Sequence, residues 1–179
     1  GENDIVVSSG NTGALLVMSK LILKMIDGVD KPALAGIWPN FKDFSIVLDL
    51  GANIECNENN LVEFSILGSE LYKTILNKSE VVAGLLNIGS EEIKGNDSIK
   101  NAHLKLQESK NLNFNYKGYV EGNEIKNGDV QVIVTDGFTG NVALKTAEGT
   151  ANFITTEIKK SFSSSFLSKI GYLFSYFAF

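Results

Sequence analysis

The chain has 179 residues, of which 44% are hydrophobic and 21% are charged, a composition typical of a folded globular domain. Its formal net charge is −5 and all sixteen basic residues are lysines, so no arginine is present to bind phosphate or base edges in a bidentate way. These features argue against nucleic-acid binding. The single cysteine, Cys56, excludes an internal disulfide and a cysteine-based metal site, and it fits a cytoplasmic protein.

In chain order, short apolar runs alternate with helix-like stretches. Pro32 and Pro39 indicate that residues 32–39 form a connection between elements. The sequence of residues 112–124 predicts a further short strand followed by an acidic turn. This alternation predicts an α/β fold of three layers, α/β/α, with a mostly parallel sheet covered on both faces. The expected strands are 4–7, 44–50, 81–87 and 130–135, and the expected helices are about 11–26, 60–76, 97–110 and 141–170.

Each of the four expected strands runs into a turn rich in glycine or asparagine. The segments are DIVVSSGNTGALLV (4–17), IVLDLGANIECN (46–57), VAGLLNIGSEEIKGND (82–97) and TDGFTGNVALKT (135–146). A strand that passes through such a turn into a helix directs several backbone N–H groups at one point in solvent, which favours an anion. Because the carboxyl ends of parallel strands share one edge of the sheet, we expect these turns to line a single crevice.

The order of six motifs resembles the PlsX-type phosphate acyltransferases, bacterial enzymes that make acyl phosphate for phospholipid synthesis. The motifs are SSGNTGALL, KPALAGIWP, VLDLGAN, LLNIGSEEIKGND, YVEGNEI and VTDGFTGNVALKTAEG, and the resemblance covers essentially the whole chain. It implies a Rossmann-like sheet of the isocitrate-dehydrogenase and phosphotransacetylase type. The family has further portions at both ends, so we expect an internal fragment truncated at both ends, with a partial catalytic domain over 1–150 and the start of a protruding helical tip over 151–179.

The resemblance also implies the reaction, in which long-chain acyl-ACP and inorganic phosphate give acyl phosphate and ACP. Phosphate is already a nucleophile, so the site need only position it and stabilise the developing oxyanion, with no metal or organic cofactor. The implied catalytic residues are Lys94 and Asn141, and the implied partners are acyl-ACP, phosphate and, in the full-length parent, a second copy of the chain. The implied substrate-binding residues are Gly10, Asn11, Thr12, Gly13, Asp49, Asn53, Gly95, Asn96, Asp136, Gly137, Thr139 and Gly140.

The C-terminal part is basic and rich in aromatic residues. Ile154, Ile158, Phe162, Phe166 and Ile170 recur every four residues, which predicts an amphipathic helix. Up to residue 160 we expect this helix to pack in a core or a dimer interface. The run 168–179 is too short to span a bilayer, and the resemblance places a membrane-touching tip here, so we expect peripheral binding to an anionic membrane. The expected contacts are Leu167, Ile170, Leu173, Phe174 and Phe177.

Other interpretations are open for the same residues. Each turn is also what a capped strand-to-helix junction without a ligand would show, and Asp49 and Asn53 would then only hydrogen-bond loop amides. Neither GNTGAL nor GFTGNV supplies the G-x-G-x-x-G of a dinucleotide-binding turn, and the phosphate loop of nucleotide-hydrolysing enzymes and the hydrolase elbow are absent from the sequence. The remaining alternatives are a short-chain phosphotransacetylase acting on acyl-CoA and a noncatalytic fragment that binds a membrane or a partner.

Overall fold

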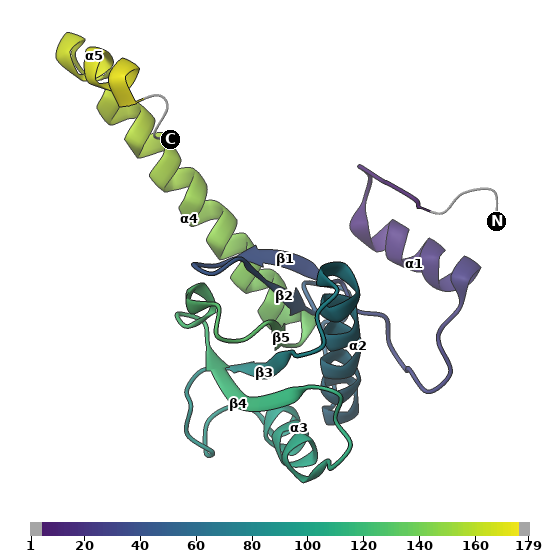
Figure 1. Cartoon of the computed structure of the whole chain (residues 1–179). Helices are drawn as coiled ribbons and strands as arrows, with labels where there is room; N and C mark the ends of the chain where they lie inside the picture. The colour runs from purple at the N-terminus through teal and green to yellow at the C-terminus, as the bar shows by residue number, and fades with distance from the viewer. Residues whose placement is uncertain (1–4, 176–179) are drawn as a thin grey trace. The chain divides into compact units, whose positions relative to one another are not determined.

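The computed structural model describes residues 5–175 (Figure 1). The chain divides into two compact units, 1–141 and 142–179. The first unit holds the sheet and the helices that follow its strands. The described residues of the second unit form two helices, the first of which begins in the first unit.

The sheet of the first unit has five strands in the order β1-β2-β5-β3-β4. Strands β2 (Phe44–Leu48), β5 (Val132–Val134), β3 (Val82–Asn87) and β4 (Asn115–Glu121) pair in parallel, so the predicted mostly parallel sheet is confirmed. In the centre, Val132 of β5 lies between Ile46 and Ala83. Side chains on both faces of the strands are buried, because Val47 and Ile133 are as inaccessible as Ile46 and Val132.

Helices α2 (Glu58–Leu76) and α3 (Asp97–Glu108) pack on the sheet and on each other. Their apolar residues, including Leu61, Phe64 and Leu106, form one buried cluster with Leu85 and Val134 of the strands. Each helix begins at an asparagine that follows the end of a parallel strand, Asn57 after β2 and Asn96 after β3. The fold therefore brings the N-terminus of a helix to the carboxyl edge of the sheet more than once.

Two expectations for the N-terminal third are wrong. Residues 5–7 form no strand and are exposed, and Asp4, the remaining residue of that expected strand, lies outside the described residues. An apolar run becomes a strand only where a neighbouring edge accepts its hydrogen bonds, and none pairs with it in the described chain. The expected connection instead contains β1 (Gly36–Pro39), which pairs antiparallel with β2. Its proline is tolerated because β1 is an edge strand.

The C-terminal helix is interrupted. We expected one helix over 141–170, but α4 (Gly137–Ser163) ends and α5 (Phe166–Ser175) begins after two serines. The hydroxyl of Ser164 donates to the carbonyl oxygen of Ser161 over 2.7 Å, and that of Ser165 accepts from the N–H of Ser168 over 3.1 Å. Such local bonds compete with the helical ladder and favour a helix end followed by a new N-cap. Among residues 5–175, no helix is long and apolar enough to cross a membrane.

Candidate active site

A hollow of about 620 Å³ lies where three helices of the first unit begin. It is lined by Asn57 at the start of α2, by Asn96 and Ser98 at the start of α3, and by Asp136 and Thr139 at the start of α4. We call this hollow, completed by Lys31, Ile54, Glu55, Cys56 and Phe138, the polar hollow. Three helix N-termini around one space concentrate partial positive charge there, which favours an anion.

The capping bonds determine which donors remain available. Asn96 accepts from the N–H of Ile99 over 2.9 Å, and Asp136 accepts from both the N–H and the hydroxyl of Thr139 over 2.8 Å. Within the described part of the chain, the backbone N–H groups of Ser98 and Phe138 have no hydrogen-bond partner. The polar hollow therefore offers unpaired amides at the starts of α3 and α4, together with the Ser98 hydroxyl.

Asp49 organises the turn after β2. Its buried carboxylate accepts from the backbone N–H groups of Leu34, Gly51, Ala52 and Asn53 over 2.7–3.1 Å, and from the Asn53 side chain over 2.8 Å. All five donors belong to the loops themselves. Asp49 and Asn53 thus shape the turn, because the Asp49 carboxylate and the Asn53 amide nitrogen bind groups of the chain itself.

The start of α4 lies directly on this turn. The N–H of Gly137 donates to the carbonyl oxygen of Asn53 over 2.8 Å. Gly140 touches Asp49 so closely that a Cβ atom at position 140 would overlap the Asp49 carbonyl oxygen. Asn141 lies over Gly51, where a Cβ would be 3.5 Å from the Asn141 Cβ. The structure therefore brings Asp49, Asn53, Gly137, Gly140 and Asn141 together, and glycine is required because the two backbones are in contact.

Lys94 projects from the turn that joins β3 to α3. Its side chain is exposed, and among residues 5–175 no carboxylate lies within salt-bridge distance of its ammonium group. Lys94 and Asn141 do not line the polar hollow. Gly95 and Asn96, which follow Lys94, line a second hollow of about 610 Å³ with Leu86, Ile88 and Ile99. The second hollow shares Asn96 and Thr139 with the polar hollow, so the two adjoin.

The predicted site residues from Gly10 to Gly13 lie outside both hollows. Asn11 caps its own helix, α1 (Thr12–Leu23), by accepting from the N–H of Ala14 over 3.1 Å. All four residues are exposed. The expected convergence of four turns is therefore met by three of them in this structure, because residues 5–7 are not part of the sheet that would have aligned the fourth.

Several lining residues were not among those expected from the sequence. Ser98 and Phe138 each lie two residues after an expected site residue, Asn96 and Asp136, and Lys31 comes from the proline-containing connection. The Asn57-x-x-Asn60 pattern signals the start of α2, since each side chain accepts from the other residue's N–H. Burial raises the pKa of the Cys56 thiol above its ordinary value, so at neutral pH this group stays protonated in the polar hollow.

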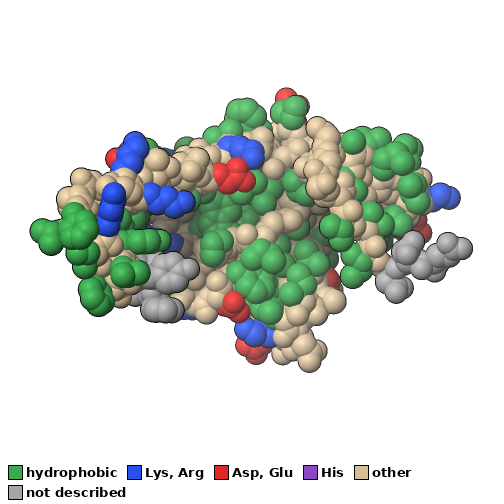
Figure 2. All heavy atoms as spheres, turned by 90° about the horizontal axis from the view of Figure 1, so that it is seen from above, with side chains coloured by type: hydrophobic (Ala, Val, Ile, Leu, Met, Phe, Trp, Pro, Cys, Tyr) green, Lys and Arg blue, Asp and Glu red, His purple; other side chains and the backbone are tan. Residues whose placement is uncertain are grey.

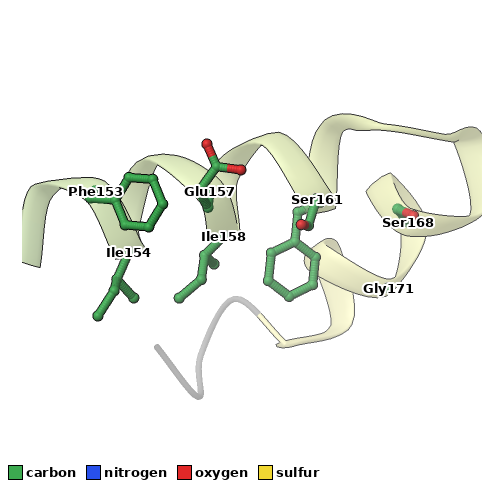
Figure 3. A pocket seen from close by; sticks show the side chains of 8 residues that line it. Phe153, Ile154, Glu157, Ile158, Ser161, Ser168 and Gly171 are labelled. Carbon is green, nitrogen blue, oxygen red and sulfur yellow. The ribbon is translucent and has the colours of Figure 1, made fainter. Parts of the chain in front are cut away.

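The second unit has a groove of its own, of about 560 Å³ (Figure 3). Phe153, Ile154 and Ile158 line it from α4, and Ser168 and Gly171 line it from α5. Phe162 and Tyr172 hold the two helices together, with ring centroids 5.3 Å apart. Of the expected membrane contacts, Leu167, Leu173 and Phe174 are 71–83% exposed, Ile170 is 38% exposed, and Phe177 lies outside the described residues.

Comparison with known proteins gives consistent results. The model of a family described as fatty acid synthesis protein matches residues 1–177. The phosphate acyltransferase of Pelagibacter ubique is 60% identical over 172 residues, 96% of this chain and 52% of the relative. Those of Paramagnetospirillum magneticum and Rhodospirillum centenum are each 51% identical, over 98% and 100% of this chain and 50% of each relative. The chain thus spans about half the length of the curated relatives it matches.

A solved structure supports the fold. The EutD phosphotransacetylase from Staphylococcus aureus superposes with a TM-score of 0.56 and 18% identity, over 75% of this chain and 46% of that chain. At this identity the likeness concerns the fold alone. It confirms the three-layer α/β/α class with a mostly parallel sheet.

Proposed function

The chain belongs to the fatty acid synthesis protein family, and on that premise we propose that it transfers a long-chain acyl group from acyl-ACP to inorganic phosphate. The observation that carries this proposal is the convergence of three helix N-termini on the polar hollow. Phosphate is the anion such a hollow suits, because unpaired amides donate to it and the helix dipoles favour its charge.

In the proposed reaction, a phosphate oxygen attacks the thioester carbonyl carbon. A bond from that oxygen to carbon forms, the carbon–sulfur bond breaks, and the departing thiolate takes up a proton from solvent. The products are acyl phosphate and the ACP thiol. No protein nucleophile takes part, which agrees with a hollow whose one thiol, that of Cys56, is kept protonated by burial.

Lys94 and Asn141 are assigned to charge stabilisation. The Lys94 ammonium has no carboxylate partner among the described residues and supplies a positive charge for phosphate or the oxyanion. The Asn141 amide makes no hydrogen bond within residues 5–175 and is available to donate to the thioester oxygen. Both side chains lie outside the polar hollow, so they act on a substrate that extends beyond it.

The second hollow is assigned to the acyl chain. Leu86, Ile88 and Ile99 give it apolar walls, and the shared Asn96 and Thr139 place it beside the phosphate. An apolar space next to an anion site suits a long acyl chain better than the two carbons of an acetyl group. This arrangement favours the acyl-ACP reading over a short-chain phosphotransacetylase.

The test uses a chimera in which this chain replaces the matched part of the Pelagibacter ubique enzyme, to which it is 60% identical over 172 residues. With palmitoyl-ACP, thiol release should require phosphate and acyl phosphate should accumulate. Acetyl-CoA is the matched control and should react far more slowly. Equal release without phosphate would show hydrolysis, and preference for acetyl-CoA would favour the short-chain alternative.

A peripheral membrane site is the second proposal, on the second unit. Exposed apolar side chains of α5 occur together with lysines of α4 and α5, and Figure 2 shows green and blue groups side by side there. Such a surface suits an anionic bilayer. The chimera should float with anionic vesicles and lose this binding on Leu173→Glu with Phe174→Glu, while Thr155→Glu with Thr156→Glu serves as the control for added charge. Undiminished binding would show that α5 packs against protein instead. The first protein partner to test would then be a second copy of the chain, by measuring the mass of the chimera in sedimentation.

A further inference from the structure

The end of β3 carries a buried asparagine that touches both ends of the Lys94 turn. The Asn87 side-chain amide donates to the carbonyl oxygen of Gly89 over 3.1 Å and to that of Lys94 over 3.2 Å. Since both partners are acceptors, the amide nitrogen must face them. Only 7% of Asn87 is exposed, so these bonds are shielded from water.

The turn closes tightly around this side chain. Gly95 has φ of +90°, and a Cβ atom there would lie 2.5 Å from the Asn87 Oδ1. The stem of Lys94 passes over Gly89, where a Cβ would be 3.1 Å from the Lys94 Cγ. The N–H of Lys94 donates to the carbonyl oxygen of Glu91 over 3.0 Å. The position of Lys94 is therefore set by a few close contacts, of which Asn87 makes the central one.

Stability alone does not account for an asparagine at this place. Its Oδ1 is buried and has no hydrogen-bond partner among the described residues. An unpaired buried acceptor is destabilising, and a leucine, which has the same branched shape but no polar atom, would not carry one. What the asparagine provides and leucine does not is a pair of donors that fix the two ends of the turn.

We propose that Asn87 is a positioning residue that holds the turn so that the Lys94 ammonium reaches the substrate. This inference rests on the proposed role of Lys94. Asn87 also lines the second hollow, but its amide nitrogen faces the carbonyl oxygens of Gly89 and Lys94, so its effect on the charged group is exerted through Lys94. Loss of its two donors lets the turn relax, and a misplacement of about 1 Å in a charged group is enough to cost up to roughly 100-fold in rate.

A double-mutant cycle in the chimera tests this. We expect Asn87→Leu to lower kcat/KM for phosphate at least about 10-fold and Lys94→Ala to lower it roughly 100-fold. In the Lys94→Ala background, Asn87→Leu should then change the rate by less than about twofold, because its target is gone. Ser69→Ala is the matched control: it removes a buried hydrogen bond, to the carbonyl oxygen of Ser65 over 2.7 Å, in α2 away from the turn.

The outcomes distinguish a failure of the Asn87 role from a failure of the Lys94 role. Additive losses from Asn87→Leu and Lys94→Ala, or an equal loss from Ser69→Ala, would overturn the positioning role. If Lys94→Ala leaves the rate unchanged, the proposed function of Lys94 fails instead. Should Asn87→Leu fail to fold by thermal melting, Asn87→Asp replaces it: the shape is kept, but oxygen now faces both carbonyl groups, and the same loss and the same non-additivity are expected.

Discussion

Two glycines of α4 provide a matched test of the contact that builds the site. Gly140 lies on the backbone of Asp49, where a Cβ would overlap the carbonyl oxygen and lie 3.0 Å from the carbonyl carbon. Gly149 lies farther along the same helix with nothing within 4 Å of its Cβ position. Alanine therefore raises helix propensity at both positions, but it creates a steric clash only at position 140.

The expected free energies follow from these contacts. Gly149→Ala should stabilise the folded state by about 0.5–1 kcal/mol, the usual gain for alanine over glycine in an exposed helix. Gly140→Ala gains the same helix propensity, but its Cβ must push the backbone of α4 away from that of Asp49. This overpacking costs about 3 kcal/mol or more. Shifting the turn after β2 to relieve the clash is unfavourable, because five hydrogen bonds to the Asp49 carboxylate hold it in place.

Urea unfolding of the chain measures both effects. With a slope of about 1–3 kcal/mol per molar urea, Gly140→Ala should lower the midpoint by roughly 1 M or more, while Gly149→Ala raises it slightly. The activity of the chimera should fall with the first change alone. Equal midpoints for the two variants would refute the reasoning that α4 begins in contact with the Asp49 turn.

Three further outcomes are expected. Lys94→Ala and Asn141→Ala should each lower turnover of the chimera roughly 100-fold with unchanged melting, the usual scale for one charge-stabilising donor, and near-normal turnover in both would end their assignment. Asp49→Asn should destabilise the chain by about 2 kcal/mol or more, since donors that faced a carboxylate would face an amide, whereas Asp43→Asn on the exposed β1–β2 turn should be neutral by the same urea assay. His103 stacks on Tyr119 and bonds Tyr116, and burial lowers its pKa below its ordinary value near 6.5. The unfolded state then binds the proton more readily, so stability should fall as the pH drops below about 6.5, and an unchanged slope in His103→Phe would contradict this.

The sequence predicted the regular part of the fold well, for physical reasons. The central strands are continuous apolar runs because both their faces are buried, and α2 and α3 begin at asparagines that cap them. The N-terminal run 4–7 has the same composition but forms no strand over 5–7, because strand formation depends on a neighbouring edge that composition does not reveal. The helix break at Ser164 and Ser165 was also missed, since the apolar period of four continues across it.

The site was predictable only in part. The family resemblance implied Asn96, Asp136 and Thr139 as substrate-binding residues, and the structure places all three at one hollow. The contributions of Ser98, Phe138 and Lys31 depend on how three separate turns meet, which no local pattern encodes. The contacts of Asn87 with the Lys94 turn could not be predicted either, because an asparagine at the end of an expected strand carries no signal of what its side chain will bind.

The central claim is that the polar hollow binds phosphate through the starts of α3 and α4. Titration of the ¹⁵N-labelled chain with phosphate, at constant ionic strength against chloride, tests it directly through the backbone amide resonances. We expect saturable shifts at Ser98 and Phe138, and no shift at Gly149, which lies on the same helix as Phe138. Shifts confined to Gly10–Gly13, or no saturable shift at Ser98 and Phe138, would contradict it.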